Sequence, residues 1–140
     1  MAAECTFCGI AGGRIAAPVV MEDDLAIAVL EHRPLFPGHC LLIPKAHYET
    51  LLDVHDDVIG LLFARARRLC AALELGLGAE GSFVAINNRV SQSVPHLHIH
   101  VVPRRKGDGL KGFFWPRGKY RDAAHAETVR AAIAQALQSL

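Results

Sequence analysis

Runs of apolar residues separated by polar and turn-forming positions predict strands in four places along the chain. The first two runs cover residues 25–31 and 40–43, and a turn at 34–38, with two prolines and a glycine, separates them. Two later runs predict strands at 82–86 and 95–102, on either side of a polar loop. The last run begins with a proline, which a strand tolerates at its first position.

Apolar residues at helical spacing predict two main helices. The longer one is expected to begin with Asp53 as its N-cap and to end at Gly76 and Gly78, because a carboxylate suits the start of a helix and glycine suits its end. A second helix is predicted from about Asp122. The apolar face of the longer helix comprises Val58, Leu61, Leu62, Leu69 and Leu73, and that of the second comprises Val129, Ile133 and Leu137.

The order of these elements favours an α+β fold. Strands grouped around one long helix, rather than alternating with helices, are typical of an antiparallel sheet, here of about five strands with two main helices. The chain has 140 residues, which is the size of one domain, and no linker or repeat divides it. We therefore predict a single domain over residues 1–140.

Composition and charge narrow the class of protein. With a formal net charge of +1 and 21% charged residues, the chain lacks the basic excess of a nucleic-acid or membrane-surface binder. It contains neither a long apolar span nor a secretory signal, so a cytoplasmic location is expected. In a reducing compartment, the C-x-x-C spacing of Cys5 and Cys8 indicates a metal site or a redox pair rather than a structural disulfide.

Three histidines at a spacing of two are the main candidate for chemistry. On a strand, His96, His98 and His100 would share one face, while the apolar residues between them face the core. Three interpretations are open at this point. The histidines are unrelated surface residues, or ligands of a catalytic metal, or a group-transfer site in which one imidazole is the nucleophile.

The segment 96–102 resembles the signature of the histidine-triad (HIT) superfamily, His-φ-His-φ-His-φ-φ with φ apolar. The opening Cys-Thr-Phe-Cys-Gly-Ile at 5–10 resembles the zinc-containing bacterial branch of that family. The segments 37–47 and 91–94 resemble two further family blocks, so the likeness covers residues 5–104, with a tail and helix at 105–140. It implies a HIT-like fold whose sheet extends across a homodimer.

The resemblance also implies an enzyme. Family members are nucleotide hydrolases or transferases that act at an α-phosphate, and here the substrates would be nucleoside phosphoramidates or dinucleoside polyphosphates of a purine. His98 would be the nucleophile and become nucleotidylated, while His100 donates a hydrogen bond to the phosphate. An imidazole can attack through one nitrogen when the other is held as N–H against an acceptor such as a backbone carbonyl.

The resemblance assigns supporting roles to other residues of this chain. His96 and His39 would belong to the histidine cluster, and Ser93 and Gln92 would reach the α-phosphate and the leaving group. Glu31 would bind the ribose hydroxyls, Ile27 would line the base pocket, and Asn88 matches a family asparagine ahead of the triad. The loop at 87–91 is shorter than the usual family version, which weakens a phosphate role for Asn88.

The zinc branch implies a structural zinc held by Cys5, Cys8, His47 and His96. Such a Cys₂His₂ set leaves no open position for a reacting water. Reduced thiols packed in the core, or a redox pair, are the alternatives for the two cysteines.

Two other functions stay open from the sequence. The protein could be a purine-nucleotide-binding regulator with vestigial catalysis, or a metallohydrolase that uses the triad as ligands. We assign no chemistry to His32, His55 or His125, and we interpret Trp115, in its Trp-Pro pair, as an aromatic anchor for the tail.

Overall fold

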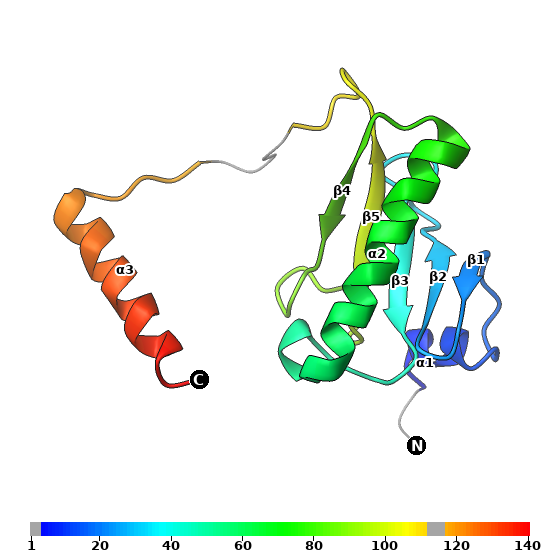
Figure 1. The fold of residues 1–140 in the computed structure, drawn as a ribbon, viewed down its shortest axis with the longest axis horizontal. Helices are drawn as coiled ribbons and strands as arrows, with labels where there is room; N and C mark the ends of the chain where they lie inside the picture. The colour runs from blue at the N-terminus through cyan, green and yellow to red at the C-terminus, as the bar shows by residue number, and fades with distance from the viewer. Residues whose placement is uncertain (1–3, 112–116) are drawn as a thin grey trace. The chain divides into compact units, whose positions relative to one another are not determined.

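The computed structural model describes residues 4–111 and 117–140, so the Trp115 prediction lies outside the described residues. One sheet holds five strands in the order β1-β2-β3-β5-β4, and every neighbouring pair is antiparallel (Figure 1). The predicted α+β class and antiparallel sheet are confirmed. The strands are β1 (Val19–Glu22), β2 (Ala26–Leu30), β3 (Cys40–Pro44), β4 (Gly81–Ala85) and β5 (Ile99–Arg104).

The described residues form one long α-helix and two shorter ones. The long helix α2 (Asp56–Leu77) lies across the sheet (Figure 1). The short helix α1 (Thr6–Ala11) precedes the first strand, and α3 (Ala123–Leu137) begins after the N-cap Asp122, as predicted. A 3₁₀ turn, η1, covers Leu51–Asp53.

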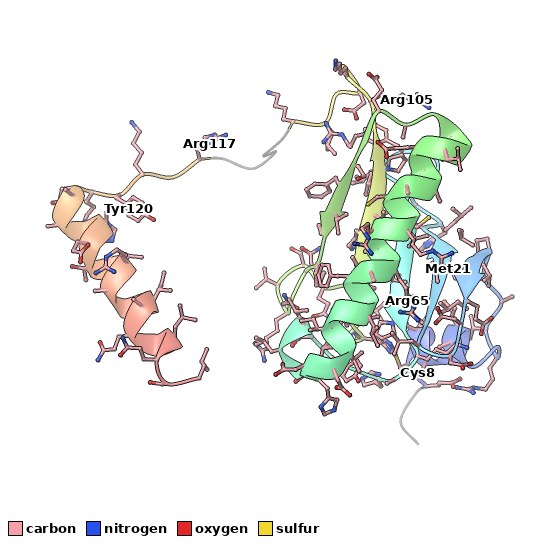
Figure 2. All side chains as sticks on the ribbon, in the orientation of Figure 1. Cys8, Met21, Arg65, Arg105, Arg117 and Tyr120 are labelled. Carbon is pink, nitrogen blue, oxygen red and sulfur yellow. The ribbon has the colours of Figure 1, made fainter. Side chains whose placement is uncertain are left out.

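Two separate apolar clusters, one on each face, bury the central strands of the sheet. The cluster that includes Leu97, Ile99 and Val101 packs with the apolar face of α2. The other cluster forms around Phe7 of α1 together with Val29 and Leu41. Arg65 lies on α2 (Figure 2) and forms a 2.8 Å ion pair with Asp23, which connects the helix to the turn after β1. Since α1 covers only part of the second face, space is left there for a cleft.

Three predicted boundaries are wrong. The last strand begins at Ile99 rather than at residue 95, so only His100 of the triad lies within β5. The long helix begins at Asp56 rather than after Asp53, because Asp53 instead completes a capping box with Thr50 at the start of η1. Gly78, in a left-handed conformation, ends α2, whereas Gly76 lies inside the helix.

The first strand was not predicted individually. β1 has four mostly exposed residues and an irregular register with β2, so it shows little of the apolar run that identifies a strand.

Contacts between residues divide the chain into two compact units, Met1–Asp108 and Gly109–Leu140. The first contains the sheet, α1 and α2, and the second contains α3. Among the described helices, none combines the length and the apolar character needed to cross a bilayer.

Candidate functional site

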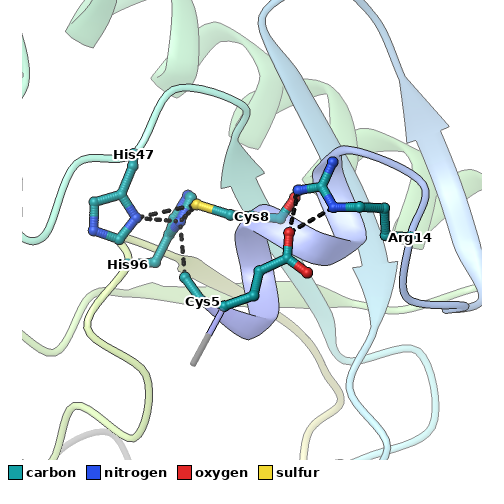
Figure 3. A network of polar contacts seen from close by, with 6 residues as sticks. Cys5, Cys8, Arg14, His47 and His96 are labelled. Carbon is teal, nitrogen blue, oxygen red and sulfur yellow. Dashed lines mark hydrogen bonds and ion pairs between the residues drawn. The ribbon is translucent and has the colours of Figure 1, made fainter. Parts of the chain in front are cut away.

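Four side chains from three distant parts of the sequence converge beside α1 (Figure 3). The ligand atoms of Cys5, Cys8, His47 and His96 all lie within 4.8 Å of one another. Cys8 Sγ lies 3.2 Å from His47 Nδ1 and 3.5 Å from His96 Nδ1. Cys5 Sγ is also 3.5 Å from His96 Nδ1, and the two Nδ1 atoms are 3.1 Å apart. The structure therefore assembles the set that the resemblance implied.

The spacing and chemistry of these atoms fit a tetrahedral zinc ion. Bond lengths of roughly 2.0–2.3 Å in a tetrahedron place neighbouring ligand atoms about 3.3–3.8 Å apart. His96 Nε2 donates a 2.8 Å hydrogen bond to the Pro44 carbonyl, which leaves Nδ1 with its lone pair directed at the cluster. Zinc ligands commonly have such an outer partner, so the residues present suit this metal.

Arg14 braces the helix that carries the two cysteines. Its guanidinium pairs with Glu4 and donates a 3.2 Å hydrogen bond to the Cys8 carbonyl (Figure 3). These contacts connect the residues before and after α1, and the helix has no side-chain cap at its own N-terminus.

The central histidine of the triad is held in a single tautomer. His98 is buried, with 4% of its surface exposed, and its Nδ1–H donates a 2.8 Å hydrogen bond to the His96 carbonyl. Because Nδ1 carries the proton, the neutral ring has its lone pair on Nε2. An imidazole needs such a free lone pair on one ring nitrogen to act as a nucleophile.

A relay of hydrogen bonds orients the third histidine as a donor. The Leu35 backbone N–H can only donate, and it lies 3.1 Å from His39 Nδ1, so His39 carries its proton on Nε2. His39 Nε2–H then donates to His100 Nδ1 at 2.9 Å, which leaves the His100 proton on Nε2. His100 can therefore donate a hydrogen bond through Nε2.

The turn before β3 places His39 for this relay. Gly38 has φ +103°, which side chains rarely permit, and a Cβ there would lie 2.5 Å from Leu77 Cδ1. The turn at Pro37 and Gly38 thus leads into β3 and places His39, just before that strand, beside His100.

Burial keeps these rings neutral. Burial lowers the pKa of His39. Burial also lowers the pKa of His100 from 6.5 to about 4, and the neighbouring His98 and His39 contribute to this shift. Burial likewise lowers the pKa of His96, more than its bond to the Pro44 carbonyl raises it. Neutral rings are the state that the relay requires.

These pKa values predict acid sensitivity. The unfolded chain binds protons at His100 near pH 6.5 and the folded chain only near pH 4, so stability present above pH 6.5 is lost as the pH falls toward 4. We expect His100→Gln to lose less unfolding free energy than wild type between about pH 7 and pH 4.5. Urea unfolding at each pH measures the difference, and an equal or larger loss in the variant would contradict the expectation.

A cleft of about 330 Å³ opens beside His98. This volume lies within the roughly 300–1,000 Å³ range of small-ligand pockets. Apolar residues form most of its wall, including Phe7 and Ile10 of α1 and Val29 of β2. Its polar residues are Thr6, Glu31, His32, Ser93 and His98.

Some of the predicted binding residues lie in this cleft and others do not. Glu31 and Ser93 line it beside His98. Ile27 is buried in the apolar cluster beneath and is not among the lining residues. The amide of Gln92 bonds to the Glu49 carbonyl at 2.6 Å and to the Arg89 N–H at 2.8 Å, and Asn88 accepts from the Leu51 N–H at 2.9 Å. Gln92 and Asn88 thus hold the loop ahead of the triad.

Two residues of this site were missed in the sequence. Phe7 packs edgewise against His98 with ring centroids 4.9 Å apart, and its position between the two cysteines is the signal that could have marked it. His32, to which we assigned no chemistry, lines the cleft, and its Nδ1 lies 3.0 Å from Glu31 Oε1.

The geometry also bears on the metallohydrolase alternative. Among residues 4–111 and 117–140, the one group of at least three His, Cys, Asp or Glu placed to hold a metal contains His96 but neither His98 nor His100. The triad therefore does not form a shared set of metal ligands.

The chain is similar to known proteins in both sequence and fold. A model of the HIT domain matches residues 13–107. A HIT-like protein of Saccharolobus solfataricus is 34% identical over 139 residues, covering 97% of this chain and 99% of that protein. The solved structure of a zinc-bound histidine triad family protein from Mycobacterium smegmatis superposes with a TM-score of 0.73 at 35% identity, covering 97% of each chain.

Two further similar proteins bear the names of enzymes. An adenylylsulfatase of Arabidopsis thaliana is 32% identical over 109 residues, 76% of this chain and 55% of that protein. A bis(5'-nucleosyl)-tetraphosphatase of Schizosaccharomyces pombe is 31% identical over 96 residues, 67% of this chain and 53% of that protein. The match thus spans about half the length of these two enzymes.

Proposed function

The chain belongs to the histidine-triad family, in its zinc-containing branch, and from this premise we propose that it is a nucleotide hydrolase or transferase acting at an α-phosphate. The proposed substrates are purine nucleoside phosphoramidates or dinucleoside polyphosphates, and the product is a nucleoside monophosphate. The observation that carries the proposal is the hydrogen bond from His98 Nδ1–H to the His96 carbonyl, at the wall of a cleft of about 330 Å³.

The first proposed step forms a bond between His98 Nε2 and the α-phosphorus. The bond from phosphorus to the amine or polyphosphate leaving group breaks in the same step. Charge then grows on the phosphate oxygens, and His100 Nε2–H is the donor proposed to stabilise it. Water attacks the nucleotidyl-His98 intermediate in the second step and releases the monophosphate, so one water is consumed overall.

The cleft supports the proposed way in which a nucleotide binds. Apolar residues of α1 and β2 offer a surface for the base, and Glu31 offers a carboxylate for the ribose hydroxyls. Ser93, in the same cleft as His98, could donate its hydroxyl to the phosphate. Ile27, Gln92 and Asn88 take no direct part in this proposal, since their side chains are engaged elsewhere.

We propose that the Cys5, Cys8, His47 and His96 site holds a structural zinc ion. Four protein ligands complete a tetrahedron, so the metal would bind the N-terminal segment to the sheet without activating water. The ion would stabilise the fold, while the residues of the cleft perform the chemistry.

Turnover of defined substrates tests the proposed enzyme. Wild-type protein is incubated with adenosine and guanosine phosphoramidates and with their dinucleoside polyphosphates, and the monophosphate is quantified by chromatography. Release of monophosphate supports the proposal. Nucleotide binding in the low micromolar range or below, without release from any of them, would instead favour the regulatory alternative.

We further propose a homodimer that joins two sheets edge to edge. β4 is one edge of the sheet, and Val84 on it is 39% exposed. We expect wild type to have a mass of about 30 kDa, twice the 15.2 kDa of one chain, and Val84→Lys to be monomeric because like charges would meet across the twofold axis. Analytical ultracentrifugation measures both.

A matched control lies on the opposite edge of the sheet. Val20 of β1 is 47% exposed, so Val20→Lys introduces the same charge on the other edge strand. A dimer that survives Val84→Lys but dissociates in Val20→Lys would show that the sheets join through β1 instead.

A further inference from the structure

Phe7 connects the metal site to the proposed nucleophile. It lies in the first turn of α1, between the ligands Cys5 and Cys8, and only 6% of it is exposed. Its ring packs edgewise on His98, with centroids 4.9 Å apart and planes at 81°, and on His96 at 6.0 Å and 77°. One aromatic side chain thus contacts a metal ligand and the reactive ring.

The orientation of the His98 ring matters more than its position alone. The last side-chain torsion of histidine has a broad, two-fold preference, so a ring can flip about it at little cost. A flip would break the 2.8 Å bond from Nδ1 to the His96 carbonyl and would exchange the attacking Nε2 for a carbon. A rigid ring packed against His98 restricts that flip, and Phe7 supplies one.

The position of Phe7 depends in turn on the anchoring of α1. This helix has six residues and no side-chain cap, so it is too short to be stable alone. Cys5 and Cys8, on either side of Phe7, meet His47 and His96 from other parts of the chain. Arg14 is the further brace, through Glu4 and the Cys8 carbonyl.

We propose that Phe7 is a positioning residue that holds His98 in its reactive orientation, and that the occupied metal site keeps Phe7 in place. The catalytic part of this inference rests on the proposed function, whereas the orientation of His98 can be observed independently of turnover. Metal occupancy would then control the orientation of the His98 ring, although no ligand of the metal touches substrate.

The test compares Phe7→Leu with Leu73→Ala. Leu73 is equally buried, at 6%, but belongs to the cluster under α2, so its truncation destabilises the protein without touching His98. In ¹⁵N-histidine-labelled protein, the Nδ1–H resonance of His98 is identified by its absence in His98→Gln. We expect this resonance to broaden or disappear in Phe7→Leu and to persist in Leu73→Ala, with zinc content unchanged in both.

Kinetics at saturating substrate give the second readout. Because misplacing a reacting group by about 1 Å can reduce a rate by up to about 100-fold, we expect nucleotidyl-enzyme formation in Phe7→Leu to be about tenfold slower than in wild type. If Phe7→Leu does not retain zinc, Phe7→Met provides a similar volume without a planar ring. A His98 resonance and a saturated rate equal to those of Leu73→Ala would overturn the inference.

The role of the metal is tested on the wild-type protein. Removal of zinc with a chelator should broaden the His98 resonance while the backbone amide signals of α2 persist. An unchanged resonance would refute the link to the metal. If wild type never forms a nucleotidyl-enzyme, the proposed function fails, and the resonance still decides whether Phe7 positions His98.

Discussion

His98→Ala is expected to reduce release of nucleoside monophosphate by about three orders of magnitude or more, because removal of a covalent nucleophile leaves no group to form the intermediate. The bond from its Nδ1–H to the His96 carbonyl is lost with the ring, but the cleft and the relay through His39 and His100 remain. The rate of monophosphate release at saturating substrate measures the loss. Intact-mass spectrometry of alkaline-quenched samples should detect the nucleotidyl adduct in wild type only.

The control for this variant is His55→Ala. His55 precedes α2 as its N-cap residue but makes no side-chain capping bond there, so its loss should leave turnover unchanged. Urea unfolding of both variants separates a catalytic effect from loss of the fold. Equal turnover by wild type and by folded His98→Ala would reject the proposed mechanism.

Cys5→Ala should remove the metal and much of the stability of the N-terminal segment. We expect about one zinc ion per wild-type chain, and we expect the variant to lose its zinc on dialysis, because removal of one thiolate ligand weakens the binding of the metal. Metal binding to the folded state alone stabilises it, so the variant should lose about 3 kcal/mol or more of unfolding free energy. Elemental analysis after dialysis measures the zinc, and urea unfolding measures the stability.

Two comparison variants locate the metal. Cys70 on α2 is also a partly buried thiol but lies outside the cluster, so Cys70→Ala should retain its zinc. His98→Ala should retain it as well, because the metal set includes His96 and not His98. Loss of zinc on His98→Ala, or full retention in Cys5→Ala, would contradict the proposed structural site.

The alternation of histidine and apolar residues in 96–101 predicted the two faces correctly although the strand boundary was wrong. Leu97, Ile99 and Val101 are buried in the cluster that packs with α2. The rings of His98 and His100 lie 5.1 Å apart, and the ring of His98 packs on Phe7 of the other cluster. Side chains can alternate between two faces without strand pairing, so the pattern holds for the three residues 96–98 that precede β5.

The sequence did not determine the contacts of individual side chains. The resemblance implied that Gln92 reaches the phosphate and that Ile27 lines the base pocket, whereas in this structure the Gln92 amide bonds to the Glu49 carbonyl and the Arg89 N–H. Ile27 is buried below the cleft wall. Neighbours along the chain do not determine which partner a flexible amide finds or how deep a strand residue lies.

The amino-acid order alone was enough for the fold class and the family, because periodicity and short motifs encode these locally. The resemblance to the family also implied which four side chains gather beside α1, and the structure brings those four together. The tautomer of His98, the relay from Leu35 through His39 to His100, and the packing of Phe7 came only from the folded arrangement. Each of these depends on backbone carbonyls, amides or rings that meet across the sheet from distant segments. A linear pattern carries no information about such distances, and they decide where a proton resides.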